Sequence, residues 1–288
     1  MSSASSIPLN SPSMRQLTSI LALTQRELTR FLRQRTRIIG AVGQPVIFWI
    51  LFGAGLRTSF RSPSWAAGLT HEVTYQEYFL PGVAVLIVLF TAIFSTISII
   101  EDRREGFLQG VLVAPVSRLS IVLSKLAAGT VLSILQAGLF LVIGPLLSSL
   151  GIGTEIDISW SMTQMLMAGI FLMLIAAELT ALGFIIAWPM NSTQGFHAIM
   201  SIVLMPMWLV SGAFFPGGDS GWLFWLIRIN PLTYGVAGLR RLLYSQPLPV
   251  TPELPSMILC VTVTAAVTAS LTLLAAWMVS RPSVHNVA

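Results

Sequence analysis

Few residues in this sequence have both the type and the spacing that catalysis requires. The single lysine, Lys125, follows Ser124, whereas a phosphate-binding loop places a glycine before its lysine. The sequence contains neither a His-Glu-x-x-His zinc motif nor a Gly-x-Ser-x-Gly nucleophile elbow. The histidines and the cysteine are too scattered to form a metal site: His71, His197, His285 and Cys260. We therefore expect a protein that is not itself an enzyme and that binds neither a cofactor nor a metal.

Glu178 is the one carboxylate that falls deep inside a long apolar stretch. Ionisable groups are costly inside a membrane and often have a function there. Glu178 could bind a proton that drives transport, or it could be a structural group that is neutral or paired with Gln136 or another helix. Both interpretations stay open. The lack of a basic residue in any other apolar stretch favours the structural one.

The densest run of charge is Glu101–Lys125, EDRREGFLQGVLVAPVSRLSIVLSK, which separates two apolar stretches. Charge this dense is unstable in hydrocarbon, so we expect the segment to be a loop at a membrane surface. Charges are followed by Gly106, a short amphipathic piece and then Ala114-Pro115, an order that is unusual for a plain connection. We therefore predict a structured loop that binds another protein.

The composition is that of a multi-pass membrane protein. The chain has 288 residues, of which 55% are hydrophobic and 9% are charged, and its mean hydropathy is +0.81. Soluble domains carry about 25% charged residues. After a polar tail at 1–13, residues 14–288 are expected to form one all-α membrane domain. Six stretches are long enough to span a bilayer: about 38–56, 80–100, 126–147, 165–188, 197–215 and 257–279.

The distribution of basic residues predicts the orientation. With both termini in the cytoplasm, eleven of the 16 basic residues lie inside: those before the first span, those at 101–125, and Arg281. The outer side then holds Arg57, Arg61, Arg228, Arg240 and Arg241. We expect a protein of the cell membrane. Because the basic residues flank apolar stretches and form no single patch, no nucleic-acid partner is expected.

Residues 14–37 have the period of an amphipathic helix. Leu17, Leu21, Leu28, Phe31 and Leu32 share one face. Such a helix is expected to lie in the membrane interface with its arginines towards anionic head groups. The alternative is a plain positively charged anchor for the first span. Four arginines share the opposite face: Arg26, Arg30, Arg33 and Arg37.

Residues 216–245 predict a hairpin of two short helices on the outer side, separated by Asn230-Pro231. Tryptophans in the first helix suit a membrane interface, so the hairpin could enter the outer leaflet and return. Arg240 and Arg241 are expected to stabilise the C-terminal end of the second helix and to reach the head groups. The hairpin residues singled out are Asn230, Pro231, Tyr234 and Arg240.

The charged segment and the later SGAFFP and INPLTYGVAGLR sequences, taken together, resemble type 2 export permeases of the ATP-binding-cassette (ABC) class. Drug and lipid exporters of the daunorubicin-resistance type are the most similar. The resemblance implies the membrane subunit of an exporter for an amphiphile, such as a drug, a lipid or a glycan-like molecule. It also implies two copies of a soluble ATPase subunit that binds ATP and Mg, and a second copy or close paralogue of the permease. A proton-coupled transporter using Glu178 and a membrane assembly factor without transport are the alternatives.

The resemblance also implies roles for residues in the charged segment. The loop after the second span would be a coupling helix seated on the ATPase at Glu101–Gln109, and the interfacial helix 14–37 would flank the same subunit. Arg103, Arg104 and Glu105 would offer ion pairs, while Phe107 and Leu108 would form an apolar knob. The family commonly has Glu at Gln109 and an acid at Ala237. The implied coupling residues are Glu101, Arg103, Arg104, Glu105, Gly106, Phe107, Gln109, Pro115 and Arg118.

Overall fold

The computed structural model describes residues 12–67, 69, 71–114, 116–151, 160–214, 221–244 and 246–281. Several sequence predictions fall outside these ranges: most of the tail at 1–13, Pro115 of the coupling segment, and 216–220 at the start of the outer hairpin.

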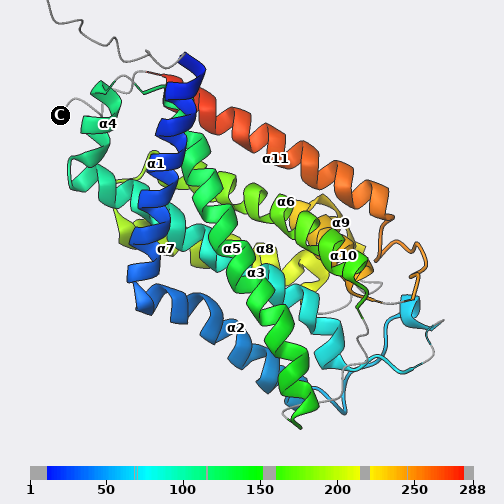
Figure 1. Cartoon of the computed structure of the whole chain (residues 1–288). Coiled ribbons are helices and arrows are strands. Elements are labelled where there is room, and N and C mark those ends of the chain that lie inside the picture. Colours follow the sequence, from blue (N-terminus) through cyan, green and yellow to red (C-terminus); the bar gives the residue numbers. More distant parts are fainter. Residues whose placement is uncertain are drawn as a thin grey trace, which may run out of the picture.

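The all-α prediction is confirmed, because every element in the described ranges is helical (Figure 1). Six helical segments are long and apolar enough to cross a membrane: α2, α3, α5, α6, the run from α7 to η3, and α11. The elements are α1 (Pro12–Arg33), α2 (Arg35–Gly55), η1 (Ser64–Ala66), α3 (Tyr75–Arg104), α4 (Phe107–Val113), α5 (Arg118–Ser149), α6 (Met162–Ala187), α7 (Thr193–Ile199), η2 (Met200–Leu204), α8 (Met205–Trp208), η3 (Leu209–Ala213), α9 (Gly221–Ile229), α10 (Pro231–Leu243) and α11 (Met257–Ser280).

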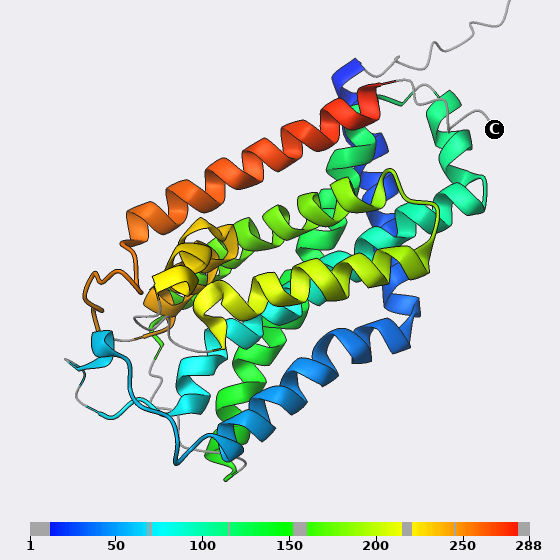
Figure 2. The same ribbon diagram turned by 180° about the vertical axis from the view of Figure 1, so that it is seen from behind.

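Helix α3 is the central element of the bundle. Its most apolar stretch is 94% buried, whereas that of α11 is only 11% buried. Helices α2, α5 and α6 contact α3, and the run from α7 to η3 lies along it on the side seen in Figure 2. The remaining faces of the outer helices carry exposed apolar side chains, as expected of surfaces that meet lipid.

The predicted loop at 101–125 is too long, and both of its ends are helical. Helix α3 continues through the charged residues to Arg104, and α5 begins at Arg118. The hydroxyl of Ser117 caps α5 by accepting a hydrogen bond from the amide of Ser120 at 3.2 Å. The connection is therefore only 105–117, and the short helix α4 occupies its middle.

The amphipathic segment is also divided differently from the prediction of one helix at 14–37. Helix α1 ends at Arg33, and the non-helical Gln34 separates it from α2. The two helices meet at a bend, and α1 lies along α5 (Figure 1). Arg37 consequently belongs to the first span and not to the amphipathic helix.

The fifth span is an irregular helix, because two π-helical turns, η2 and η3, interrupt it. Near its end, Gly212 has a φ of +74°, a left-handed value that glycine adopts without strain. Two tyrosines of α3 hold this end: Tyr78 donates to the carbonyl of Gly212 and Tyr75 to that of Phe214, each at 2.7 Å.

Gly82 of α3 permits the close approach of this irregular end. A Cβ atom at Gly82 would lie 2.7 Å from Cβ and 2.9 Å from Cα of Ala213. We predict that Gly82→Ala destabilises the protein by about 1–3 kcal/mol, because backbone would have to move. Gly138→Ala in α5 is the matched control, since a Cβ there meets no heavy atom within 4 Å. Thermal unfolding in detergent should show a lower Tm for Gly82→Ala alone; equal Tm values would contradict this packing.

Candidate functional site

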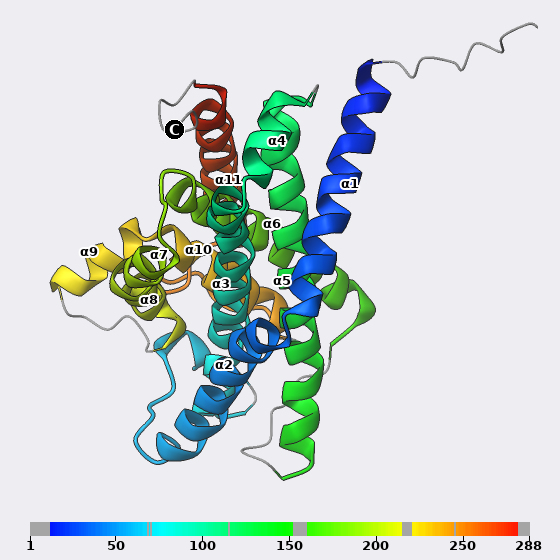
Figure 3. The same cartoon turned by 90° about the vertical axis from the view of Figure 1, so that its left-hand side faces the viewer.

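At one end of the bundle, eight charged side chains from four helices form a group that we name the charged cluster. The start of α1, helix α4 and the end of α11 lie at this end (Figure 3). Four members are cations and four are carboxylates, so their formal charges cancel. They are Arg26, Glu27 and Arg30 of α1, Arg37 of α2, Glu101 and Asp102 of α3, Glu105 at the end of α3, and Lys125 of α5.

Asp102 lies at the centre of the charged cluster. Its Oδ1 accepts from Arg26 at 2.7 Å and from Arg30 at 2.6 Å, and its Oδ2 accepts from Lys125 at 2.8 Å. The carboxylate side chain is 2% exposed. A charge this buried is stable only when it is paired and hydrogen-bonded. Asp102 therefore fixes the positions of α1 and α5 relative to the end of α3.

Glu27 connects α1 to the same two helices a second time. Its Oε1 pairs with Lys125 at 2.9 Å, and its Oε2 accepts from the hydroxyl of Ser98 at 2.7 Å. Lys125 also donates to Ser98 Oγ at 2.8 Å. Lys125 thus has three hydrogen-bonding partners in the described part of the chain, which matches the three protons of an ammonium group.

Two further carboxylates extend the charged cluster towards α2 and α4. Glu101 pairs with Arg30 at 3.0 Å and also with Arg37. Glu105 pairs with Arg30 at 3.0 Å but is 60% exposed, so solvent screens this contact. Burial alone would lower the pKa of Arg26, but its hydrogen bond and charge interaction with Asp102 raise that pKa above its ordinary value. The guanidinium stays charged.

Two arginines of α1, Arg26 and Arg30, face protein and not lipid head groups, contrary to the prediction. Arg26 and Arg30 face the acidic end of α3, while Leu17 and Leu21 of α1 are 55% and 60% exposed. Arg33 is exposed. The reason is that Glu101, Asp102 and Glu105 lie within reach and offer carboxylates with better geometry than mobile head groups. On the apolar face of α1, Leu17, Leu21 and Leu32 stay exposed, whereas Phe31 is buried against the protein.

The turn from α3 to α4 provides the exposed surface at this end. Gly106 has a φ of +77°, which confirms that a glycine allows the tight turn here. The expected apolar knob is wrong, because Leu108 is 5% exposed and the guanidinium of Arg26 covers the ring of Phe107 at 3.5 Å. Val113 at the end of α4 is instead 86% exposed. Gln109 is partly buried, and its Oε1 has no hydrogen bond among the described residues.

The remaining arginines of the charged segment bind main-chain carbonyls within the chain. Arg103 donates to the carbonyls of Trp188 and, at 2.7 Å, Met190, and Arg104 donates to that of Asn191 at 3.0 Å. Arg118 donates to the carbonyl of Val279 at 2.9 Å, where a cation stabilises the C-terminal end of α11. These guanidiniums therefore hold α6 and α11 to α3 and α5; binding of a partner by Arg103 and Arg104 stays a prediction.

At the opposite end, helices α9 and α10 meet at Asn230. The side chain of Asn230 caps α10 by accepting from the amide of Leu232 at 3.0 Å, and it donates to the carbonyl of Met207 at 2.6 Å. Pro231 is the first residue of α10, where its missing amide proton costs nothing. Tyr234 donates its hydroxyl to the carbonyl of Arg228 at 3.0 Å. Two helices thus flank Asn230 in the described residues; that they form an outer hairpin entering a leaflet stays a prediction.

Arg240 and Arg241 donate hydrogen bonds to main-chain carbonyls, whereas we expected them to reach the lipid head groups. Arg240 is 3% exposed and donates to the carbonyls of Gly212 at 3.0 Å and Tyr78 at 3.3 Å. Arg241 holds the segment that leads to α11, donating at 2.7 Å to the carbonyls of Leu248, Pro249, Leu254 and Pro255. Both guanidiniums thus bind main-chain carbonyls at this end of the bundle.

Glu178 lies on α6 with 3% of its surface exposed. Within the described residues, no hydrogen bond or ion pair reaches its carboxyl group. Gln136, the partner considered from the sequence, instead accepts a hydrogen bond from Thr91 at 3.1 Å. The structural and proton-binding interpretations of Glu178 both remain untested.

Six apolar helical segments, each long enough to cross a bilayer, indicate a multi-pass membrane protein. The chain belongs to the ABC-2 type transporter family, whose model matches residues 18–244. That range includes the whole charged cluster and both helices beside Asn230. The chain is accordingly a transporter permease subunit, and its family generally works with an ABC ATPase.

Three similar proteins are each named as a transport permease, ycf38. The one from Cyanophora paradoxa is 28% identical over 228 residues, covering 78% of this chain and 74% of the relative. That from Porphyra purpurea is 27% identical, covering 77% of this chain and 72% of the relative. That from Pyropia yezoensis is also 27% identical, covering 77% and 73%.

We predict that Asp102→Asn destabilises the protein by about 3–5 kcal/mol, because Arg26, Arg30 and Lys125 would lose their common counter-charge. Glu105→Gln is the control for removing one carboxylate from the charged cluster, and it should cost at most about 1 kcal/mol. Thermal unfolding of the purified protein measures both. If the two variants unfold at the same temperature, Asp102 is not the centre of the charged cluster.

Proposed function

We propose that this chain is the membrane subunit of an ATP-driven exporter. A separate soluble ABC ATPase would bind ATP and Mg, and this permease would carry the transport pathway. The proposal is supported by the family membership and by the position of the charged cluster beside α4. The complex would contain two copies of the ATPase. Its membrane part would be either two copies of this permease or one copy with a close paralogue.

The single observation that carries this proposal is the connection between α4 and the spans. The turn at Gly106 joins α4 directly to α3, and Arg26 of α1 contacts both Phe107 of α4 and Asp102 of α3. A force on α4 would therefore move α1 and α3 together, and Lys125 would transmit it to α5. Packed helices with strong ion pairs move as units, which is how rigid-body switching between two states begins.

Orientation follows from this assignment. The ATPase is a cytoplasmic subunit, so the charged cluster and both termini would lie in the cytoplasm of a cell-membrane protein. The excess of basic residues at this end agrees with that direction. The other end of the bundle, with α9 and α10, would then face outwards.

An amphiphilic substrate fits the helix surfaces. Helix α6 exposes four methionines, whose flexible side chains adapt to apolar molecules of varied shape: Met162, Met165, Met167 and Met173, between 46% and 72% exposed. Paired copies of the permease would enclose such a surface between them. Drug, lipid and glycan-like amphiphiles share this chemistry, and multidrug efflux is one case of it.

The deciding experiment is to purify the tagged chain from its native membranes and to identify the ATPase that co-purifies. The complex, reconstituted in vesicles, should export an amphiphilic dye in a way that vanadate abolishes. A proton-coupled carrier would instead lose transport with a protonophore and with Glu178→Gln. Transport that survives vanadate would refute the ATP-driven proposal, and a complex with no ATPase would indicate an assembly factor.

Val113 is the residue through which we expect α4 to bind the ATPase. Val113→Asp should reduce the amount of co-purified ATPase about tenfold, since a charge would replace an exposed apolar contact. Val250→Asp is the matched control, because this valine is 67% exposed at the opposite end. Equal recovery of ATPase with both variants would show that α4 is not the docking helix.

Glu105→Arg tests whether movement of α4 is transmitted to the spans, and not whether the ATPase binds α4. The introduced guanidinium would face Arg30, which now pairs with Glu105 at 3.0 Å, and the repulsion should loosen α1 from the turn before α4. We expect normal insertion and ATP hydrolysis but export lowered at least tenfold; Glu105→Gln, without repulsion, should lower it much less. Export at the wild-type rate by Glu105→Arg would refute the role of this turn.

A further inference from the structure

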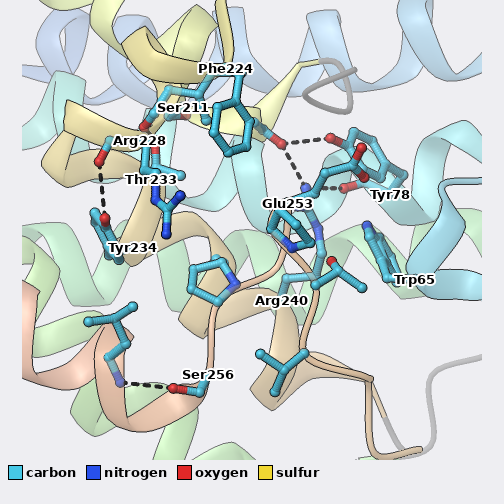
Figure 4. Close-up of a pocket in the computed structure, with 18 residues that line it drawn as sticks. Trp65, Tyr78, Ser211, Phe224, Arg228, Thr233, Tyr234, Arg240, Glu253 and Ser256 are labelled. Atoms are coloured by element: carbon cyan, nitrogen blue, oxygen red, sulfur yellow. Dashed lines mark hydrogen bonds between the residues drawn. The ribbon is translucent and has the colours of Figure 1, made fainter. Parts of the chain in front are cut away.

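A cavity of about 450 Å³ opens at the end of the bundle opposite the charged cluster. Its walls come from the beginning of α3, the end of the fifth span, α9, α10 and the segment before α11 (Figure 4). We propose that this cavity binds the anionic head group of an amphiphile, an oxyanion of the phosphate or carboxylate class. Its volume lies within the range of small-molecule sites, roughly 300–1,000 Å³.

A buried guanidinium that forms no ion pair among the described residues gives the cavity its binding group. Arg240 lines the cavity and is 3% exposed. Its Nη2 donates to the carbonyls of Gly212 and Tyr78, while its Nε has no hydrogen bond among the described residues. Within the same part of the chain, Arg240 forms no ion pair. A buried charge is costly unless it is paired, so this arrangement favours an anion that arrives from outside.

The surroundings of Arg240 hold its charge in place. Its guanidinium lies 4.2 Å from the ring centre of Tyr78 and 5.6 Å from that of Trp65. Figure 4 shows Arg240 and the Tyr78 hydroxyl directed at the same carbonyl, that of Gly212. Aromatic faces stabilise a cation without neutralising it. The site is therefore built before any ligand binds, which lowers the entropic cost of binding.

A second guanidinium gives the cavity a net positive charge. Arg228 lines it from α9, is exposed, and lies 5.5 Å from the ring centre of Phe224. Glu253 also lines the cavity, so its charged wall holds two cations and one carboxylate. The hydroxyls of Ser211 and Thr233 lie in the same wall but already donate to the carbonyls of Trp208 and Ile227. Recognition thus depends on the guanidiniums.

Apolar residues at the mouth favour an anion that carries a hydrocarbon chain. Leu259 at the start of α11 and Val250 line the cavity and are 43% and 67% exposed. Ile258, which precedes Leu259 in the chain, is 78% exposed, and Trp225 of α9, the helix that contributes Phe224 and Arg228 to the wall, is 61% exposed. Tryptophans are enriched where a membrane meets water. A head group in the cavity could therefore keep its chain against α11 and the bilayer.

Calorimetric titration of the purified full chain in a neutral maltoside detergent tests the inference. The probes are hexyl phosphate, inorganic phosphate and hexyl glucoside. We expect hexyl phosphate to bind at least about tenfold more tightly than hexyl glucoside, because only the phosphate pairs with the guanidiniums. Tighter binding of hexyl phosphate than of inorganic phosphate would show that the cavity recognises the head group of an amphiphile. Equal binding of the two would show that it recognises a free oxyanion, and would overturn the proposal that the ligand is an amphiphile.

Variants locate the site. Arg240→Gln should abolish binding of hexyl phosphate, and Arg228→Gln should weaken it about tenfold. Arg240 also binds two carbonyls, so loss of binding by its variant is interpreted only if the Tm shows that the variant is folded. Arg228 is exposed, and its variant tests the site independently; its Tm is measured as well. Arg57→Gln is the control, since Arg57 is exposed at the same end outside the cavity wall. The proposal would be overturned if a folded Arg228→Gln variant bound hexyl phosphate with unchanged affinity. It would also be overturned if the wild-type protein bound hexyl glucoside as tightly as hexyl phosphate. No ATPase is present, so this outcome is independent of the proposed export function.

Discussion

The pairing of Asp102 with three cations is the interaction on which one whole end of this protein depends. Arg26, Arg30 and Lys125 come from two different helices, yet their charges meet on one carboxylate that is 2% exposed. None of these groups would be stable there alone. The charged end of α3, the direction of α1 and the start of α5 are therefore one structural unit, and α4 is attached to it at Gly106.

Periodicity and hydropathy were sufficient to predict the six spans, because each needs only about 20 apolar residues. The same reasoning ended α3 too early, at 100 and not at Arg104. Hydropathy treats every charge as a cost, whereas charges that find partners within the chain are compatible with a continuing helix. The break at Asn230-Pro231 could also be located from the sequence, because its cause is local: Asn230 caps α10 and Pro231 begins it.

The partners of the arginines could not be predicted, because each depends on contacts between distant segments. Arg30 and Asp102 are 72 residues apart, and Arg118 and Val279 are 161 apart. A basic helical face indicates only that a negative group is near, which could be lipid, a partner protein or the same chain. Glu27 was the available signal: one acid on the basic side of α1 fits a paired, internal surface better than a lipid-facing one.

Helix α3 also connects the two ends of the molecule physically. Tyr78 near its start and Asp102 near its end are separated by about 36 Å of helix at 1.5 Å per residue. Most of the helix between them is buried, so a displacement at Asp102 cannot be absorbed by local bending as easily as in an exposed helix. It would reach Tyr78, whose hydroxyl and carbonyl hold Gly212 and Arg240. The cavity beside Arg240 would then change shape when α4 moves, so the proposed anion binding at one end and the proposed ATPase docking at the other would be thermodynamically linked.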